Sequence, residues 1–314
     1  MSNLNDLFIE YNDNIRLKNS DYNKMTEKRD KIIEELKKDE NLMSFTVINL
    51  GSYKLRTGVK YKDNDYDIDC GIRLNIPVDK LKQYDPNECK NSVYDAIKGH
   101  RDKKFKHKCL TAIYKKDDHP NFHIDFPVFA YDSDENKYYL AEGLKDNVEW
   151  IESKPSDLIE YLNLDNDDYK RIVRILKKWN NKVFASEKKH AKAPSIALTI
   201  EACEWFNNNK YSNDLETLID IVKNIKNLID EKSIYKKNPF SNNNLYYKMD
   251  DDEECVEIFS EKIDYLLNIL NEAKELEESS LYECAKKLRK VFPDFPEPEK
   301  EEASRSFSSS AKYA

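Results

Sequence analysis

The sequence predicts an α+β protein with a mixed first half, built from strands and helices, and an all-helical second half. All five glycines lie before residue 144, where turns between strands need their backbone freedom (Gly51, Gly58, Gly71, Gly99, Gly143). The rest of the chain has no glycine and carries apolar residues at helical spacing. A chain of 314 residues has room for two domains of this kind.

The first half is expected to start with two helices and continue with strands. Residues from Leu4 to Lys38 carry apolar stripes at helical spacing, with a break near Asn19. A further helix should begin at Asp85-Pro86, since proline is tolerated in a first helical turn, and run to about Gly99. Strands are expected at 45–50, 66–74, 107–114, 122–130 and 137–141, which are rich in β-branched and aromatic residues.

The second half should begin at Pro155 and consist of helices. They are expected at 157–162, 167–184, 195–206, 214–229, 253–277 and 281–291. Prolines at 293, 296 and 298 then end regular structure, and an acidic, serine-rich tail follows. We therefore expect a core with N-terminal helices over 1–154, an α-helical domain over 155–296 and a disordered tail over 297–314.

The charge balance argues against some classes of protein. The net charge is −8, which disfavours broad binding to duplex nucleic acid because such binding needs a strong basic field. It leaves room for a local basic cleft that holds a triphosphate. No apolar run approaches the roughly 20 residues that span a bilayer, and the N-terminus lacks a basic segment leading into an apolar one. We therefore expect a soluble, cytoplasmic protein without a membrane partner.

The cysteines are predicted to be reduced thiols. Six are scattered along the chain without a Cys-x-x-Cys pair. A group of possible zinc ligands falls between residues 100 and 123 (His100, His107, Cys109, His119, His123), but its spacing matches no standard finger. A zinc site is the less favoured interpretation.

Three carboxylates carry the main functional signal. Alternate residues of a strand share a face, so Asp67 and Asp69 should point to the same side while Ile68 points into the sheet. Asp125 projects in the same way from the strand at 122–130. If the two strands are neighbours, the three acids converge and repel one another unless a divalent cation is present.

Magnesium suits such a site because it prefers oxygen ligands and commonly joins carboxylates to substrate phosphates. Two ions can stabilise both the attacking and the leaving oxygen of an in-line displacement. Asp67 and Asp69 would bridge two Mg²⁺ ions, for which Mn²⁺ could substitute. Asp125 would bind one of them and help to deprotonate an attacking ribose hydroxyl. The alternative is a solvent-facing strand with an acidic face.

A Gly51-Ser52 turn precedes the acidic pair and is predicted to bind phosphate. It follows a strand and begins a short helix-like piece, and a helix N-terminus presents N–H groups to a phosphate. Glycine allows close approach of the backbone, and the Ser52 hydroxyl adds a donor. The dipeptide is a common turn on its own, so its meaning depends on Asp67 following it closely.

The helical half offers two further candidates, Lys177 and Ser195. Four basic residues lie off the apolar stripe of one predicted helix (Arg171, Arg174, Lys177, Lys178). They could either reach a triphosphate or form a solvated basic face. Ser195 starts another helix, where it could either cap the helix or contact phosphate.

With these residues in place, the chain resembles the DNA polymerase β-like nucleotidyltransferases. More narrowly, it resembles the bacterial CD-NTases, the cyclic-oligonucleotide synthases of anti-phage CBASS systems and relatives of animal cyclic GMP-AMP synthase. The resemblance rests on segments spread over most of the chain: Gly51-Ser52-Tyr53-Lys54, Asp67-Ile68-Asp69, His123-Ile124-Asp125-Phe126-Pro127, Leu176-Lys177-Lys178-Trp179, Ala193-Pro194-Ser195, Lys237-Asn238-Pro239 and Phe292-Pro293-Asp294-Phe295-Pro296.

The resemblance implies a bilobal fold, in which a nucleotidyltransferase core with a mixed sheet and an N-terminal spine helix packs on a C-terminal helical domain. It implies Asp67, Asp69 and Asp125 as catalytic metal ligands. Gly51, Ser52, Lys177 and Ser195 would contact the nucleotide. The implied activity joins ATP and/or other NTPs into a cyclic di- or trinucleotide second messenger in anti-phage defence and releases pyrophosphate.

The resemblance also suggests partners and leaves two alternatives. NTP substrates could include ATP, GTP or pyrimidine NTPs, and strong nucleic-acid binding is not expected. A ubiquitin-ligase-like conjugating enzyme from the same operon could ligate Ala314 to a target, the other interpretation being an ordinary disordered end. The alternatives are a nucleotidyltransferase acting on RNA or tRNA, and a catalytically silent nucleotide-binding sensor.

Overall fold

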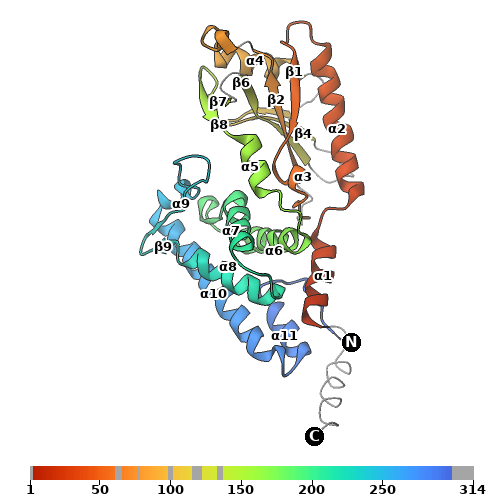
Figure 1. Cartoon of the computed structure of the whole chain (residues 1–314), viewed down its shortest axis with the longest axis vertical. Coiled ribbons are helices and arrows are strands. Elements are labelled where there is room, and N and C mark those ends of the chain that lie inside the picture. The colour runs from red at the N-terminus through yellow and green to blue at the C-terminus, as the bar shows by residue number, and fades with distance from the viewer. Residues whose placement is uncertain are drawn as a thin grey trace. The chain divides into compact units, whose positions relative to one another are not determined.

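The computed structural model describes residues 3–60, 66–76, 78–97, 102–114, 122–132 and 137–298. They group into two compact units (Figure 1): a sheet unit, Leu17–Asn163, and a helical unit that joins the residues up to Arg16 with the chain from Leu164 onward. The α+β class predicted from the sequence is confirmed, since a mixed sheet and a separate set of helices make up the two units.

A mixed sheet of eight strands, counted over the part of the chain that the structure describes, forms the centre of the sheet unit. Seven of the strands follow the order β3-β4-β5-β2-β6-β7-β8. The eighth strand, β1, pairs with β2 and lies outside this linear order. The strands are β1 Phe45–Asn49, β2 Tyr66–Leu74, β3 Asp102–Phe105, β4 Leu110–Tyr114, β5 Phe122–Phe126, β6 Val128–Asp132, β7 Lys137–Leu144 and β8 Asn147–Ser153. β2 runs parallel to β5 and β6, whereas the other pairs are antiparallel.

Pro127 divides the strand predicted at 122–130 into β5 and β6. Proline has no N–H to donate to a ladder, and the Pro127 carbonyl accepts a hydrogen bond of 2.9 Å from the Ile72 N–H. The first part of β2 therefore pairs with β5, and its last part pairs with β6. The structure also adds β3 and β8, which lie at the two ends of the strand order. β3 is rich in charged residues, which suits an edge strand. For the same reason it lacks the alternation of apolar and polar residues from which a strand is predicted.

Helices complete the sheet unit and close its core. They are α2 Asn19–Lys38, α3 Gly51–Leu55, the 3₁₀ helix η1 Val78–Gln83, α4 Pro86–Ala96 and α5 Pro155–Leu162. In Figure 1, α2 lies alongside β1. Its buried face, which includes Met25 and Ile32, joins one hydrophobic cluster with Ile68 of β2 and Ile124 of β5. The strands that carry the predicted site are therefore anchored on their apolar face.

The helical unit follows the predicted helices closely. It contains α1 Leu4–Ile15, α6 Asp167–Val183, η2 Lys189–Ala191, α7 Ser195–Asn208, α8 Asp214–Lys226, α9 Tyr247–Asp250, α10 Glu253–Glu277 and α11 Leu281–Leu288, with a small hairpin of β9 Ile229–Asp230 and β10 Ser233–Ile234. The helices α6, α7, α8, α10 and α11 begin at the residues expected from the sequence. The apolar stripe predicted for α6 is buried.

The contacts assign α1 to the helical unit, whereas the sequence-based division placed it in the core over 1–154. The reason is aromatic packing: the Phe8 and Phe295 ring centroids are 4.8 Å apart, and the Tyr11 and Phe292 centroids are 5.7 Å apart. The chain therefore leaves the helical unit after Arg16, builds the sheet unit and returns at Leu164.

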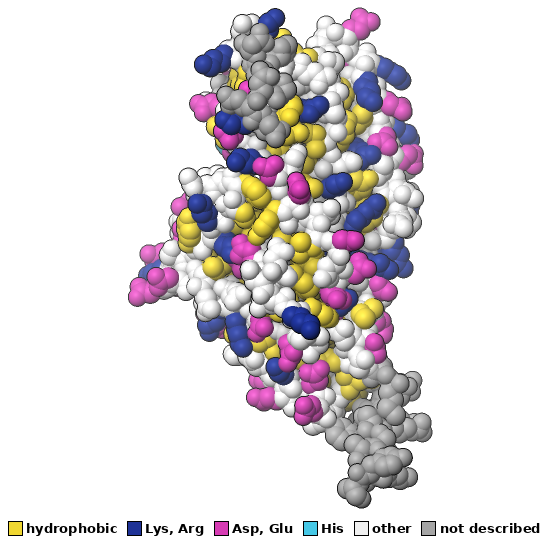
Figure 2. Space-filling model, in the orientation of Figure 1, with side chains coloured by type: hydrophobic (Ala, Val, Ile, Leu, Met, Phe, Trp, Pro, Cys, Tyr) yellow, Lys and Arg dark blue, Asp and Glu magenta, His cyan; other side chains and the backbone are white. Residues whose placement is uncertain are grey.

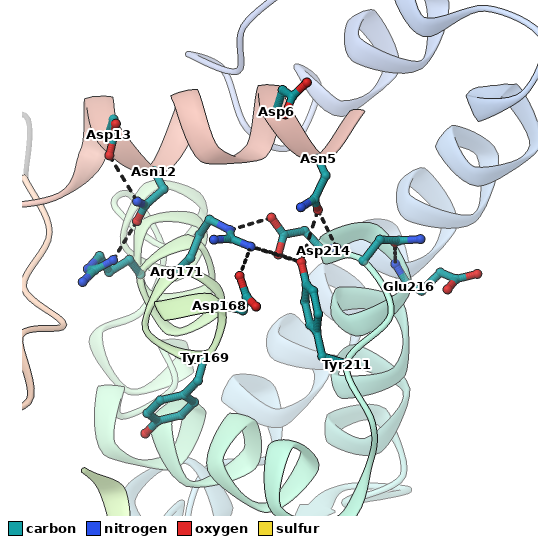
Figure 3. Close-up of polar contacts among 12 residues, drawn as sticks. Asn5, Asp6, Asn12, Asp13, Asp168, Tyr169, Arg171, Tyr211, Asp214 and Glu216 are labelled. Carbon is teal, nitrogen blue, oxygen red and sulfur yellow. Dashed lines mark hydrogen bonds and ion pairs between the residues drawn. The ribbon is translucent and has the colours of Figure 1, made fainter. Parts of the chain in front are cut away.

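A buried ion pair ties α6 to α8 (Figure 3). Arg171 donates from Nε to Asp214 Oδ2 at 2.6 Å and from Nη2 to Asp214 Oδ1 at 2.9 Å. Asp168 accepts a further bond of 2.6 Å from Arg171, and Asn5 of α1 accepts a bond of 3.0 Å from the Asp214 N–H. Asp214 and Asp168 raise the pKa of the Arg171 guanidinium above its usual value, against the effect of burial. This network fixes the three helices to one another.

These contacts correct one sequence-based expectation. A solvated basic face was considered for four residues, of which three are buried and Lys178 is half-buried (Arg171, Arg174, Lys177, Lys178). The guanidinium of Arg174 donates to Asn12 of α1 at 2.9 Å. Both guanidinium groups therefore form hydrogen bonds inside the helical unit, and these bonds compensate for the cost of burying the two charges.

The surface is mixed in charge. Figure 2 shows basic and acidic side chains interspersed on the visible face of each unit. That face shows no extended basic field of the kind that binds duplex nucleic acid, in the part of the molecule that is drawn in colour. Among the described residues, no helix is both long enough and apolar enough to cross a bilayer.

Candidate active site

The parallel pairing of β2 with β5 brings the predicted carboxylates together on one face of the sheet. Asp69 is the register partner of Asp125, and Asp67 is that of His123. Ile68 and Cys70, between and after the two acids of β2, are fully buried. Paired residues of a parallel ladder project to the same side. The prediction that the two strands are neighbours is thus confirmed, and the three acids share the half-exposed face.

Gly51 lies directly against one of these acids. It begins α3 with φ +58°, a conformation that favours glycine, and a Cβ at this position would lie 1.8 Å from Oδ2 of Asp69. The Leu50 N–H also donates to the Asp69 carbonyl at 3.1 Å. The turn therefore requires glycine for two reasons, its left-handed backbone and the carboxylate beside it. Ser52 follows in the first turn of α3 and is half-buried.

Asp125 is held by two side chains that sequence reasoning missed. The Thr111 hydroxyl on β4 donates to Asp125 Oδ1 at 2.5 Å. The Lys106 ammonium, from the turn between β3 and β4, lies 3.3 Å from Oδ1 and 3.4 Å from Oδ2. Thr111 and Asp125 are register partners in the antiparallel β4–β5 pair. No local motif marks Thr111 or Lys106, so only the strand register could have identified them.

The donor chemistry of this face fits a hard divalent cation. Asp67, Asp69 and Asp125 supply carboxylate oxygens, the ligands that Mg²⁺ prefers, and a positively charged group already lies beside Asp125. Within the described ranges, no three His, Cys, Asp or Glu side chains are gathered closely enough to enclose a metal ion. Asp67, Asp69 and Asp125 thus share a face of the sheet but are not gathered closely enough in this structure to hold an ion by themselves.

The possible zinc ligands receive no support from their placement. His100 and His119 lie outside the described residues. His107 is exposed, and its Nδ1 lies 3.3 Å from Glu142. All six cysteines are free, and burial raises the pKa of the Cys109 thiol to about 12.

Lys177 and Ser195 lie in the helical unit, whereas Gly51, Ser52 and the three acids belong to the sheet unit. Lys177 is on α6 and is only 5% exposed. Ser195 is the first residue of α7, and Pro194 is the N-cap, without a side-chain capping bond. The expectation that Ser195 caps the helix is therefore wrong, because the cap position falls one residue earlier. Ala314 lies outside the described residues.

Asn180 connects the segments that carry Lys177 and Ser195. Its Nδ2 donates to the Ala193 carbonyl at 2.8 Å, and its Oδ1 accepts from the Ala193 N–H at 3.3 Å. Asn180 lies three residues after Lys177, hence on the same side of α6. Ala193 lies two residues before Ser195. This fully buried amide thus fixes the start of α7 against the part of α6 that bears Lys177.

A small basic pocket lies beside the start of α7. It has a volume of about 190 Å³ and is lined by residues of η2, the segment before α7, and α9. Its lining combines three lysines and a histidine with apolar and aromatic side chains, and includes no acid (Lys189, His190, Lys192, Pro194, Leu245, Tyr246, Tyr247, Lys248, Met249). The lining thus sets positive charge beside apolar and aromatic surface, in a chain of net charge −8.

Comparison with known proteins adds a family and a fold. Residues 1–166 match the family model described as the Second Messenger Oligonucleotide or Dinucleotide Synthetase domain. The chain is similar to the CD-NTase CdnG of Bradyrhizobium diazoefficiens, solved in complex with GTP, with a TM-score of 0.71 and 14% identity over 88% of this chain and 93% of that one.

Two further solved structures match nearly the whole chain. One is Vibrio cholerae DncV cyclic AMP-GMP synthase in complex with nonhydrolyzable GTP (TM-score 0.70, 18% identity, 93% of this chain and 96% of that one). The other is E. coli MS115-1 CdnC in its complex with HORMA-deltaN (TM-score 0.69, 13% identity, 94% of this chain and 98% of that one). At these identities the matches show a shared fold.

Proposed function

Because the chain belongs to the Second Messenger Oligonucleotide or Dinucleotide Synthetase family, we propose that it is an active Mg²⁺-dependent nucleotidyltransferase. It joins nucleoside triphosphates into a cyclic di- or trinucleotide second messenger and releases pyrophosphate. The observation that carries this proposal is the alignment of Asp69 with Asp125 across parallel strands, with Gly51 against the Asp69 carboxylate.

The chemistry is an in-line displacement at phosphorus. The ribose hydroxyl oxygen of one nucleotide forms a bond to the α-phosphorus of another, the bond to the β-phosphate oxygen breaks, and pyrophosphate leaves. The hydroxyl proton passes to the Asp125 carboxylate, whose position Thr111 holds. A second displacement of the same kind closes the ring of a dinucleotide.

The remaining residues bind and orient the substrates. Asp67, Asp69 and Asp125 would hold two Mg²⁺ ions, which, when bound, supply positive charge for the attacking and leaving oxygens. The Gly51 backbone and the Ser52 hydroxyl contact the triphosphate of the donor. Lys177 and Ser195 contribute further phosphate contacts from the helical unit. Orientation of this kind accounts for a large part of phosphoryl-transfer catalysis.

Two features support nucleotide substrates. The pocket beside α7 carries positive charge and aromatic surface, which complement a phosphate and a base. The related CdnG and DncV were both solved with guanine nucleotides.

We further propose that the product serves anti-phage defence, and that Ala314 is conjugated by an operon-encoded, ubiquitin-ligase-like enzyme. Mass spectrometry of the protein co-expressed with its operon tests the last point, which free, unmodified Ala314 would contradict.

The activity is tested by incubating the purified protein with Mg²⁺ or Mn²⁺ and radiolabelled NTPs, singly and mixed, before phosphatase treatment and chromatography. A small phosphatase-resistant product supports the proposal. Products that form only with added RNA would identify an RNA-modifying enzyme instead. Nucleotide binding without turnover would identify a silent sensor.

The site assignment is tested by Asp67→Asn combined with Asp69→Asn. This variant should make no product while its thermal unfolding stays cooperative. Glu149→Gln is the matched control, since Glu149 is an exposed acid on β8 of the same sheet. Undiminished turnover in the double variant would refute the assignment of the carboxylates.

A further inference from the structure

Lys90 is a charged side chain that is completely buried. It lies on α4 with no exposed surface, and its ammonium group sits 4.7 Å from the centroid of the Phe105 ring. Burial lowers its pKa to about 8. Burial of an ammonium group costs free energy unless its donors form hydrogen bonds, so the fold must supply acceptors for all of them.

All three hydrogens of the Lys90 ammonium have backbone acceptors. Its Nζ donates to the carbonyl of Lys106 at 2.9 Å, to that of His107 at 2.8 Å and to that of Gly143 at 2.9 Å. An ammonium has three donors and no acceptor, so the group is fully satisfied. The first two carbonyls belong to the turn between β3 and β4, and the third belongs to β7.

Backbone hydrogen bonds close the same turn. The Lys106 N–H donates to the Cys109 carbonyl at 2.9 Å, and the Gly143 N–H donates to the His107 carbonyl at 2.8 Å. Lys90 therefore joins three segments that are distant in sequence: α4, the β3–β4 turn and β7. The turn depends on it, because removal of the ammonium takes this donor from the Lys106 and Gly143 carbonyls and leaves the His107 carbonyl with the Gly143 N–H alone.

The two side chains that hold Asp125 lie in this turn and in the strand that follows it. Lys106 is in the turn itself, and Thr111 is the second residue of β4 directly after it. Both contact the Asp125 carboxylate, at 3.3 and 2.5 Å. A displacement of the turn would thus reach Asp125 through Lys106 first, since Thr111 is also held by the β4–β5 ladder.

We propose that Lys90 is a positioning residue of the active site, which fixes the β3–β4 turn so that Lys106 can hold the Asp125 carboxylate. The inference rests on the proposed function only in assigning chemistry to Asp125. Lysine suits the task because its ammonium is a compact point charge with three donors, whereas the planar guanidinium of arginine directs its donors outward in a fork.

Lys103 offers a matched control. It lies on β3, and its Nζ donates to the Tyr94 carbonyl of α4 at 2.7 Å and lies 4.2 Å from the Tyr94 ring centroid. Lys103→Met therefore removes a lysine that joins α4 to β3, the strand directly before the turn, without removing a contact of the turn itself. Both Lys90→Met and Lys103→Met are expected to lower the melting temperature, so stability alone does not separate them.

The first test uses Cys109, requires no catalysis and reports on the turn. Cys109 is half-buried, whereas the other five cysteines, all of which the structure describes, are buried. Alkylation by iodoacetamide, located by peptide mass spectrometry, should be about tenfold faster at Cys109 in Lys90→Met than in the wild type. Lys103→Met should leave the rate unchanged. Loss of the Lys90 charge alone would disfavour the thiolate and slow the reaction, so a faster rate reports opening of the turn.

The second test is a double-mutant cycle on turnover. Lys90→Met and Lys106→Ala should each lower kcat about tenfold with little change in KM, and the double variant should be no slower than Lys106→Ala. Additive losses would overturn the inference, as would an unchanged Cys109 alkylation rate in Lys90→Met. If no variant or wild-type protein makes product while Cys109 reacts faster in Lys90→Met, the proposed function fails and the role of Lys90 in holding the turn stands.

Discussion

The Thr111 hydroxyl donates a hydrogen bond of 2.5 Å to Oδ1 of Asp125. Thr111 is 1% exposed and lies on β4, directly across the ladder from Asp125. A short bond from a buried hydroxyl to a carboxylate is charge-assisted, and it fixes the orientation of the acid. The Lys106 ammonium lies beside both oxygens of the same carboxylate, 3.3 Å from Oδ1 and 3.4 Å from Oδ2.

Replacing Thr111 with valine keeps the shape of the side chain and removes the donor. We expect kcat to fall about 10- to 100-fold, in line with the loss of other groups that orient metal-binding carboxylates. Steady-state kinetics at saturating Mg²⁺ measure the change. Thr111→Ser keeps the hydroxyl and should retain most of the activity, and equal losses in the two variants would contradict this role.

Gly51→Ala should inactivate the enzyme through the carboxylate that it displaces. The added Cβ would lie 1.8 Å from Asp69 Oδ2, so either Asp69 or the turn must move. The left-handed backbone adds a cost of about 1–2 kcal/mol to folding. Product formation measures the first effect and urea unfolding the second. Full activity in a folded Gly51→Ala protein would show that the position of Asp69 is not critical.

Asn180→Ala should affect substrate binding in the helical unit. It removes two hydrogen bonds to the Ala193 backbone, and we expect a loss of about 2–3 kcal/mol in the free energy of unfolding. The KM for NTP should rise more than kcat falls, because the segments of Lys177 and Ser195 lose their connection.

The neighbouring asparagine is the control for this prediction. Among the described residues, the one hydrogen bond that the Asn181 side chain donates goes to the Lys177 carbonyl of its own helix, at 2.9 Å. Asn181→Ala should therefore change both quantities much less. Similar KM values in the two variants would remove Asn180 from substrate binding.

Stability should depend on pH through Lys90. Burial lowers the pKa of its ammonium to about 8, against the opposing charge of Glu142. The unfolded chain keeps this proton up to about pH 10.4, so between these values the unfolded state binds more protons than the folded state. The free energy of unfolding of the wild type should therefore rise with pH in this window relative to Lys90→Met.

Urea unfolding at about pH 7.5 and about pH 9.5 measures this difference. Comparison with Lys90→Met cancels the other lysines and the tyrosines, which titrate in both proteins. Parallel pH dependences in the two proteins would show that Lys90 keeps its ordinary pKa in the fold.

The predictable part of the site was the part encoded by strand alternation. Asp67, Asp69 and Asp125 alternate with fully buried neighbours, so their shared face follows from the period of a strand. The Gly-Ser turn was found because it follows a strand and precedes the acids. The helix starts at Asp167, Ser195 and other positions were also readable, because caps and apolar stripes are local signals.

The contacts that the sequence did not reveal are long-range. Lys90 reaches the Gly143 carbonyl across more than 50 residues, and Thr111 meets Asp125 only through the β4–β5 register. Buried lysines and arginines also look like solvated ones in a sequence, which is why Arg171 was not recognised as half of an ion pair. Partners of this kind are set by tertiary packing and not by any local pattern.

The contact of Phe8 with Phe295 sets the order in which the protein can be assembled during its synthesis. α1 leaves the ribosome early, yet its aromatic partners emerge only after the whole sheet unit has been made. Since domains tend to fold as units while the chain grows, the sheet unit can fold first, as a loop closed between two parts of the other unit. Until Phe295 has been synthesised, the apolar face of α1 has no aromatic partner from this part of the chain. We therefore expect nascent chains to be most prone to aggregation during that interval.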